Sequence, residues 1–64
     1  MFIFVSRYDN FTHRVGDIDS LEDLIYGLTD NMCTAKRMIC VAKYMNIGDI
    51  FVTEGNVLTY GEDT

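Results

Sequence analysis

Short segments of apolar and polar residues follow one another along this chain, and each pattern predicts one element of secondary structure. Residues 2–6 form an apolar run rich in β-forming side chains, and residues 11–15 alternate between apolar and polar side chains, so both segments are predicted strands. Asp9-Asn10, between them, has the composition of a two-residue turn. The expected product is a hairpin in which Phe4 lies opposite Val15.

Two helices are predicted next, because apolar residues recur at helical spacing. The first is expected over residues 20–28, with Ser20 as its N-cap. Its apolar stripe consists of Leu21, Leu24, Ile25 and Leu28. The second is expected over residues 32–46 and has a wider apolar face. Gly48 follows it and is suited to a left-handed residue that ends a helix.

The last part of the chain predicts a second hairpin. Residues 50–53 and 57–60 are rich in β-forming side chains, and Gly55-Asn56 between them is typical of a tight turn. Residues 61–64 form a polar tail. The order ββααββ predicts an α+β fold, with a small antiparallel sheet and two helices packed on one of its faces. Residues 1–64 are expected to form a single domain.

Both faces of the predicted hairpins carry large apolar side chains. In the last hairpin one face holds Ile50, Val52 and Val57, and the other holds Phe51, Leu58 and Tyr60. Two short helices can cover only one face of the sheet. The other face is therefore expected to expose apolar side chains, and an exposed apolar patch of this kind is typical of an interaction site.

The charge of the chain limits its partners. Ten acidic residues against five basic ones give a net charge of −5 over 64 residues. Direct binding to nucleic acid or to an anionic membrane is not expected, because both require many Lys and Arg side chains. A basic protein is the natural complement of such a surface. The sequence also contains no apolar stretch of about 20 residues and no pattern typical of a signal peptide.

Cys33 and Cys40 fall in the second predicted helix, seven residues apart. A helix would separate their Cα atoms by roughly 10 Å, which is too far for a disulfide. Both thiols are therefore expected to be reduced and packed, as in a cytoplasmic protein. A thiol-redox protein is a less favoured hypothesis, because a reactive thiol needs a basic environment.

The chain offers little for catalysis or for a cofactor. His13 is the only histidine, and its place in an alternating segment predicts an ordinary strand residue. One His and two Cys do not form a zinc-binding spacing, and the glycines do not form a phosphate-binding motif. We therefore expect no catalytic residue, no metal and no cofactor.

Four acidic residues fall within seven positions: Asp17, Asp19, Glu22 and Asp23. One interpretation is electrostatic, since carboxylates at a helix N-terminus interact favourably with the helix dipole. The other is an acidic recognition surface. Together with Asp9, Asp30 and Glu54, these carboxylates would imitate a row of phosphates and attract a basic nucleic-acid-binding groove.

In size, acidity and lack of catalytic groups, the chain is similar in general character to phage-encoded accessory proteins, including anti-restriction and anti-CRISPR inhibitors, although no motif carries this similarity. That similarity implies a non-enzymatic inhibitor that blocks a basic, nucleic-acid-binding protein in the host cytoplasm. The expected partner-binding residues are Asp17, Asp19, Glu22, Asp23, Asp30, Phe51 and Tyr60. The alternative is a structural homodimer with no inhibitory role.

Overall fold

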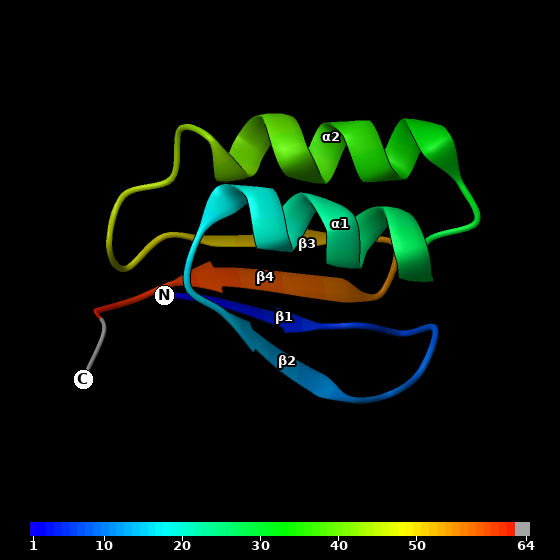
Figure 1. Ribbon diagram of the computed structural model, residues 1–64, viewed down its shortest axis with the longest axis horizontal. Coiled ribbons are helices and arrows are strands. Elements are labelled where there is room, and N and C mark those ends of the chain that lie inside the picture. The colour runs from blue at the N-terminus through cyan, green and yellow to red at the C-terminus, as the bar shows by residue number, and fades with distance from the viewer. Residues whose placement is uncertain (63–64) are drawn as a thin grey trace.

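Four antiparallel strands form one sheet, and two helices lie side by side on one of its faces in the computed structural model, which describes residues 1–62 (Figure 1). The elements are β1 (Phe2–Val5), β2 (Thr12–Val15), α1 (Ile18–Leu28), α2 (Met32–Ala42), β3 (Ile50–Thr53) and β4 (Asn56–Tyr60). The predicted ββααββ order and α+β class are confirmed. The predicted polar tail extends beyond the described residues.

The strand order in the sheet is β2-β1-β4-β3. Each hairpin therefore contributes one central strand and one edge strand, and the two hairpins meet along β1 and β4. In this central pair Phe2 lies opposite Tyr60 and Phe4 lies opposite Leu58. The sheet thus joins residues from nearly opposite ends of the sequence.

The core lies between the sheet and the helices, and the strand period of two selects its members. Alternate residues of the central strands, Phe2, Phe4 and Leu58, point toward the helices and are buried. The helices add the buried residues Leu21, Ile25, Ala35, Met38, Ile39 and Ala42. The predicted stripe of the first helix is confirmed, because Leu24 and Leu28 also pack against this core.

The register of the first hairpin differs from the prediction. Phe4 pairs with His13 rather than with Val15. The loop is longer than two residues: the Asn10 N–H donates to the Ser6 carbonyl at 2.9 Å, and Asn10 adopts a left-handed φ of 60°. A shift of two residues leaves the side chains of β1 and β2 on their predicted faces, since the strand period is two.

Helix α1 begins two residues earlier than predicted, and its N-cap is Asp17 rather than Ser20. The Asp17 carboxylate accepts the backbone N–H of Ser20 at 2.7 Å. Ser20 lies in the first turn of the helix, and its backbone N–H is the group that Asp17 caps. Both residue types are good caps, so composition alone does not choose between them.

Helix α2 begins as predicted at Met32, with Asn31 as its N-cap, but ends at Ala42 rather than at residue 46. After it, Tyr44 donates to the Val41 carbonyl three residues back, which tightens the last turn and ends the α-helix. Gly48 does have a left-handed φ of 97°, yet it stands at the entry to β3, where its N–H donates to the Tyr60 carbonyl.

The second hairpin turns at Glu54-Gly55 rather than at Gly55-Asn56. Both residues have positive φ, 49° and 82°, which is the backbone of the tight turn that suits two twisted strands. Asn56 instead begins β4 and is fully buried, and its side-chain oxygen accepts the backbone N–H of Arg7 at 3.0 Å. This bond fastens the tip of one hairpin to the loop of the other.

Candidate functional site

Acidic side chains follow the solvent side of α1. We define the acidic surface as the carboxylates of Asp17, Asp19, Glu22, Asp23 and Asp30. Asp17, Asp19, Asp23 and Asp30 are exposed, and Glu22 is half-buried. At 100° per residue, Asp19 and Asp23 fall on the side of the helix opposite the buried pair Leu21 and Ile25. Asp19, Glu22 and Asp23 therefore share one side of α1, and Asp17 and Asp30 flank the helix at its two ends.

The acidic surface is not neutralised by neighbouring bases. None of its carboxylates forms an ion pair within residues 1–62, and residues 17–30 include no Lys or Arg. Within residues 1–62, Asp17 is the member of the group whose side chain accepts a hydrogen bond: the N–H of Ser20 donates to it and holds the pKa of Asp17 below its usual value. The other four carboxylates are free for a partner's cations, since no hydrogen bond within residues 1–62 occupies them.

Tyr26 lies within the acidic surface and was missed by sequence reasoning. It is 39% exposed, and it stands three residues after Asp23 and four before Asp30, on the same side of the helix. The sequence did contain a signal for its exposure, because Tyr26 falls outside the apolar stripe of the first predicted helix. An exposed Tyr between carboxylates offers a flat apolar ring and a hydroxyl to a partner, as is common at protein interfaces.

The neighbouring helix has the opposite charge. Lys36, Arg37 and Lys43 are exposed on α2 and its C-cap, and no acid occurs between Met32 and Lys43. The helix layer is therefore divided into an acidic half over α1 and a basic half over α2. Asp9 and Glu54, the two remaining acids of the predicted carboxylate row, lie in the loop between β1 and β2 and in the turn between β3 and β4, at one end of the molecule (Figure 1).

Asp9 and Glu54 are engaged within the fold. Asp9 accepts the N–H of Phe11 at 3.0 Å, and its second oxygen lies 2.6 Å from Nε2 of His13. The Phe11 amide, followed by His13, holds the pKa of Asp9 below its usual value. Glu54 accepts the hydroxyl of Thr34 at 2.6 Å. His13 is thus a strand residue of β2, and its contact with Asp9 helps to close the loop between β1 and β2.

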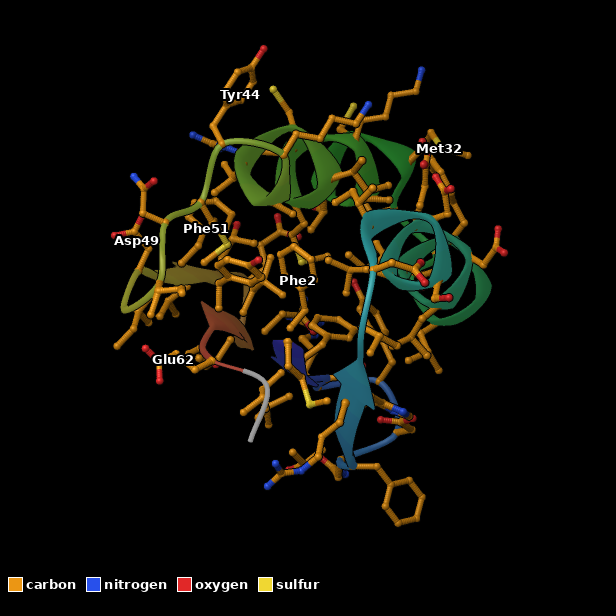
Figure 2. The ribbon with its side chains drawn as sticks, turned by 60° about the vertical axis from the view of Figure 1, so that its left-hand side comes forward. Phe2, Met32, Tyr44, Asp49, Phe51 and Glu62 are labelled. Carbon is orange, nitrogen blue, oxygen red and sulfur yellow. The ribbon has the colours of Figure 1, made fainter. Side chains whose placement is uncertain are left out.

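The two aromatic candidates, Phe51 and Tyr60, do not lie on the open face of the sheet. Both share the helix-facing side with Phe2 and Phe4 and pack against the core. The ring of Tyr60 lies 4.5 Å from that of Phe2, centroid to centroid. Figure 2 shows Phe2 and Phe51 pointing between the layers. The helices cover the more aromatic of the two faces, so the expectation of exposed sheet aromatics is corrected.

The open face of the sheet is aliphatic instead. Two rows of paired residues cross its four strands: Val52, Val57, Val5 and Thr12 form one row, and Ile50, Thr59, Ile3 and Arg14 form the other. Val52 and Ile50 are 62% and 67% exposed. No acidic residue occurs in either row. This face and the acidic surface lie on opposite sides of the sheet, so one flat partner does not contact both.

The cysteines and the end of α2 differ from the prediction as well. Cys33 and Cys40 are both free thiols, but they are exposed rather than packed, because the buried side of α2 is occupied by residues such as Ala35, Met38 and Ile39. Cys40 borders a hollow of about 400 Å³ between the end of α2 and β3. Its other lining residues are Val41, Tyr44, Met45, Asp49, Ile50 and Phe51.

A second, smaller hollow of about 230 Å³ lies between the start of α2 and the β3–β4 turn. Within residues 1–62, no group of three or more His, Cys, Asp or Glu side chains is arranged to hold a metal ion. In the same part of the chain, no helix has the length and apolar character needed to cross a membrane. No protein-family model, no curated protein and no solved structure matches this chain.

Proposed function

We propose that this protein is a non-enzymatic binding module whose acidic surface docks on a basic protein. The single observation that carries the proposal is the stripe of carboxylates on the solvent side of α1, which no cation in residues 1–62 neutralises. The partner class that fits this stripe is a nucleic-acid-binding protein, because its groove presents Lys and Arg side chains to a row of phosphates.

The geometry of the stripe supports this class of partner. Asp19 and Asp23 are one helical turn apart, so their backbone positions are separated by about 6 Å along the axis, and Asp30 extends the row past the end of α1. Tyr26 adds a flat ring at the centre of the row. A rigid helix holds these groups in place before contact, which reduces the entropic cost of binding.

Opposite charge on the two surfaces would accelerate their encounter and make binding sensitive to salt. By occupying the groove, the module would exclude nucleic acid and act as an inhibitor of the phage-encoded, anti-restriction or anti-CRISPR type. The basic half over α2 would then lie beside the partner groove and outside it, because partner cations repel it.

Capture on the immobilised protein tests the proposal. Proteins from a bacterial lysate that bind heparin, and therefore carry basic grooves, are passed over the wild type and over Asp19→Asn/Asp23→Asn. We expect the wild type to retain a specific protein at low salt and to release it at high salt, and the double variant to lose most of this retention. The retained protein should also lose its nucleic acid when the wild type is added.

A matched control changes the other helix. Lys36→Gln/Lys43→Gln alters two exposed charges in the same layer and should leave capture intact. Equal capture by the wild type and the Asp19→Asn/Asp23→Asn variant would contradict the proposal, and so would the absence of any retained protein at low salt.

A further inference from the structure

The two edges of the sheet differ in how they are protected. β2, at one edge, carries Arg14 and Thr12 on the open face. β3, at the other edge, has the sequence Ile-Phe-Val-Thr, with no charged residue and no proline. Natural edge strands usually carry charges, prolines or bulges that block pairing with another strand. The β3 edge lacks these devices, although the β2 edge of the same sheet has one.

The free peptide groups of this edge belong to Ile50 and Val52. Hydrogen bonding alternates along an antiparallel pair. Thr53 and Asn56 flank the two-residue turn, and Tyr60 donates to the Asp49 carbonyl, which places residues 49, 51 and 53 in hydrogen-bonding positions toward β4. The N–H and C=O groups of Ile50 and Val52 therefore point away from the sheet, into solvent.

Exposed apolar side chains gather around this edge. Ile50 and Val52 flank it on the open face, and Tyr44 and Ile47 lie close to it in the sequence that leads into β3. Tyr44 is 81% exposed and projects from the end of α2, away from the body of the molecule (Figure 2). The hollow of about 400 Å³ is lined by Tyr44 and Ile50 of this group, together with Phe51.

We propose that β3 pairs with β3 of a second copy of this chain, antiparallel and across a two-fold axis at Phe51. In this register Ile50 lies opposite Val52 of the second copy. Ile50 and Val52 of the second copy each donate an N–H to the other's C=O, and the symmetric pair does the same. The four free N–H and four free C=O groups of the dimer are thus all satisfied by four hydrogen bonds. The two sheets then form one continuous sheet of eight strands, with helices on one face.

The helix layer permits this arrangement. α2 contacts both β3 and β4, so it lies over the outer pair of strands at this edge. With strands about 4.8 Å apart, a helix midway between β3 and β4 would lie about 10 Å from its copy across the two-fold axis, which is an ordinary helix packing distance. The hollow lined by Cys40, Tyr44 and Phe51 lies beside the two-fold axis, where the second copy fills it.

Charge complementarity selects a second copy over an unrelated strand. In the two-fold register Asp49 lies opposite Thr53 of the other copy. Arg37 borders the hollow that Thr53 also lines, and Asp49 borders the hollow near Phe51. The pairing therefore brings Arg37 of each copy toward Asp49 of the other, twice by symmetry. Glu54 lines the same hollow as Arg37, and its carboxylate is engaged by the Thr34 hydroxyl. The acidic surface lies over the opposite half of the sheet, so the net charge of −5 per chain does not oppose this contact.

Sedimentation of the full chain over a range of concentrations tests the proposal. The variant Val52→Pro removes an N–H that points to solvent in the single chain, so β4 keeps its partners, and edge strands tolerate proline at such positions. In the dimer it removes two of four hydrogen bonds, and we expect the dissociation constant to rise by about tenfold or more. Thr12→Pro makes the matched change on the β2 edge and should leave dimerisation unchanged.

Two further measurements leave the sequence of β3 unchanged. Amide hydrogen exchange at Ile50 and Val52 in the wild type should slow as the concentration rises, whereas exchange at Thr12 and Arg14 should not. A short bismaleimide reagent should join two copies of Cys33→Ser through Cys40, and should fail to join two copies of Cys40→Ser.

A wild type that remains a monomer at hundreds of micromolar overturns the proposal. A dimer that tolerates Val52→Pro but is lost in Val5→Lys overturns it as well, because that result indicates sheets packed face to face. Crosslinking through Cys33 alone would contradict the two-fold register. None of these outcomes depends on the acidic surface, so the dimer and the proposed function succeed or fail separately.

Discussion

Thr34, in the first turn of α2, donates its hydroxyl to the Glu54 carboxylate at the tip of the β3–β4 hairpin, at 2.6 Å. The residues are 20 positions apart in sequence, and Thr34 is buried while Glu54 is exposed. The bond therefore fixes the start of one helix to a turn of the sheet. It is also charge-assisted, which makes it stronger than a bond between neutral groups.

Removing this hydroxyl should destabilise the fold. Thr34→Val keeps the shape of the side chain, and we expect a loss of about 1 kcal/mol in the free energy of unfolding, because exposed Glu54 regains water. Urea denaturation followed by circular dichroism measures the change. Thr12→Val, an exposed site on the open face, should stay within about 0.5 kcal/mol of the wild type. Equal effects of the two substitutions would contradict a specific role for the bond.

Glycine is required at position 55 but not at position 27. Gly55 has a φ of 82°, and an added Cβ would lie 3.1 Å from Cδ of Arg7, so Gly55→Ala should cost about 1 kcal/mol or more. Gly27 lies inside α1 with open space around it, and Gly27→Ala should stabilise the protein by roughly 0.5–1 kcal/mol. Thermal unfolding of the two variants gives the sign of each stability change. A change of the same sign in both would contradict the different roles assigned to the two glycines.

The cap of α1 predicts part of the acid sensitivity of the fold. The Ser20 amide lowers the pKa of Asp17 below 3.8 in the folded state. A carboxyl with a lowered pKa stabilises the fold above its unfolded pKa, and this stabilisation is lost as the pH falls through the folded pKa. The contribution should therefore be complete at neutral pH and should decline below about pH 5.

Asp17→Asn tests this dependence, since Asn keeps an oxygen that can cap the helix but does not titrate. We expect its free energy of unfolding to fall less steeply than that of the wild type between neutral and strongly acidic pH. Urea titrations at several pH values give the two slopes. Parallel curves for the two proteins would rule out a contribution from this carboxyl.

Buried Asn56 should not tolerate a charge. Its oxygen accepts the Arg7 N–H, and its Nδ2 is buried without a partner among residues 1–62. Asn56→Asp keeps the acceptor but buries a carboxylate, and it should cost at least about 2 kcal/mol at neutral pH. Burial raises the pKa of the new carboxyl, so the gap to the wild type should narrow as the pH falls. Asn46→Asp, at an exposed site, should show neither effect; a pH-independent loss in Asn56→Asp would indicate a steric cause.

The number, type and order of the elements could be predicted from the sequence, because the apolar period switches clearly between strand and helix. The leucine stripe placed α1, and the strand period placed Phe51, Leu58 and Tyr60 on one face. Turns were harder. A turn at Gly55-Asn56 and a turn at Glu54-Gly55 both require a positive φ at Gly55. Only the pairing of Val52 with Val57 decides that Glu54 is the other turn residue.

Long-range packing decided the rest. Which face of the sheet the helices cover depends on the fit of Phe2 and Phe4 against Leu21 and Ile25, and no local pattern contains that information. The same holds for Cys40, which lies at the margin of the apolar side of α2. The clustering of acidic residues on and around α1 could be predicted, because charge on one short helix is a local property of the sequence.

The strand order has a consequence for how this chain acquires its structure. Phe2 and Phe4 leave the ribosome before Tyr60 and Leu58, which lie opposite them in the central pair of strands. Contacts between such distant segments form slowly, and one edge of β1 stays unpaired until β4 has been made. A nascent chain that stalls before residue 56 thus lacks β4, an inner strand of the sheet. The edge of β1 that β4 would pair with then stays exposed, and such a chain becomes a substrate for chaperones and proteases.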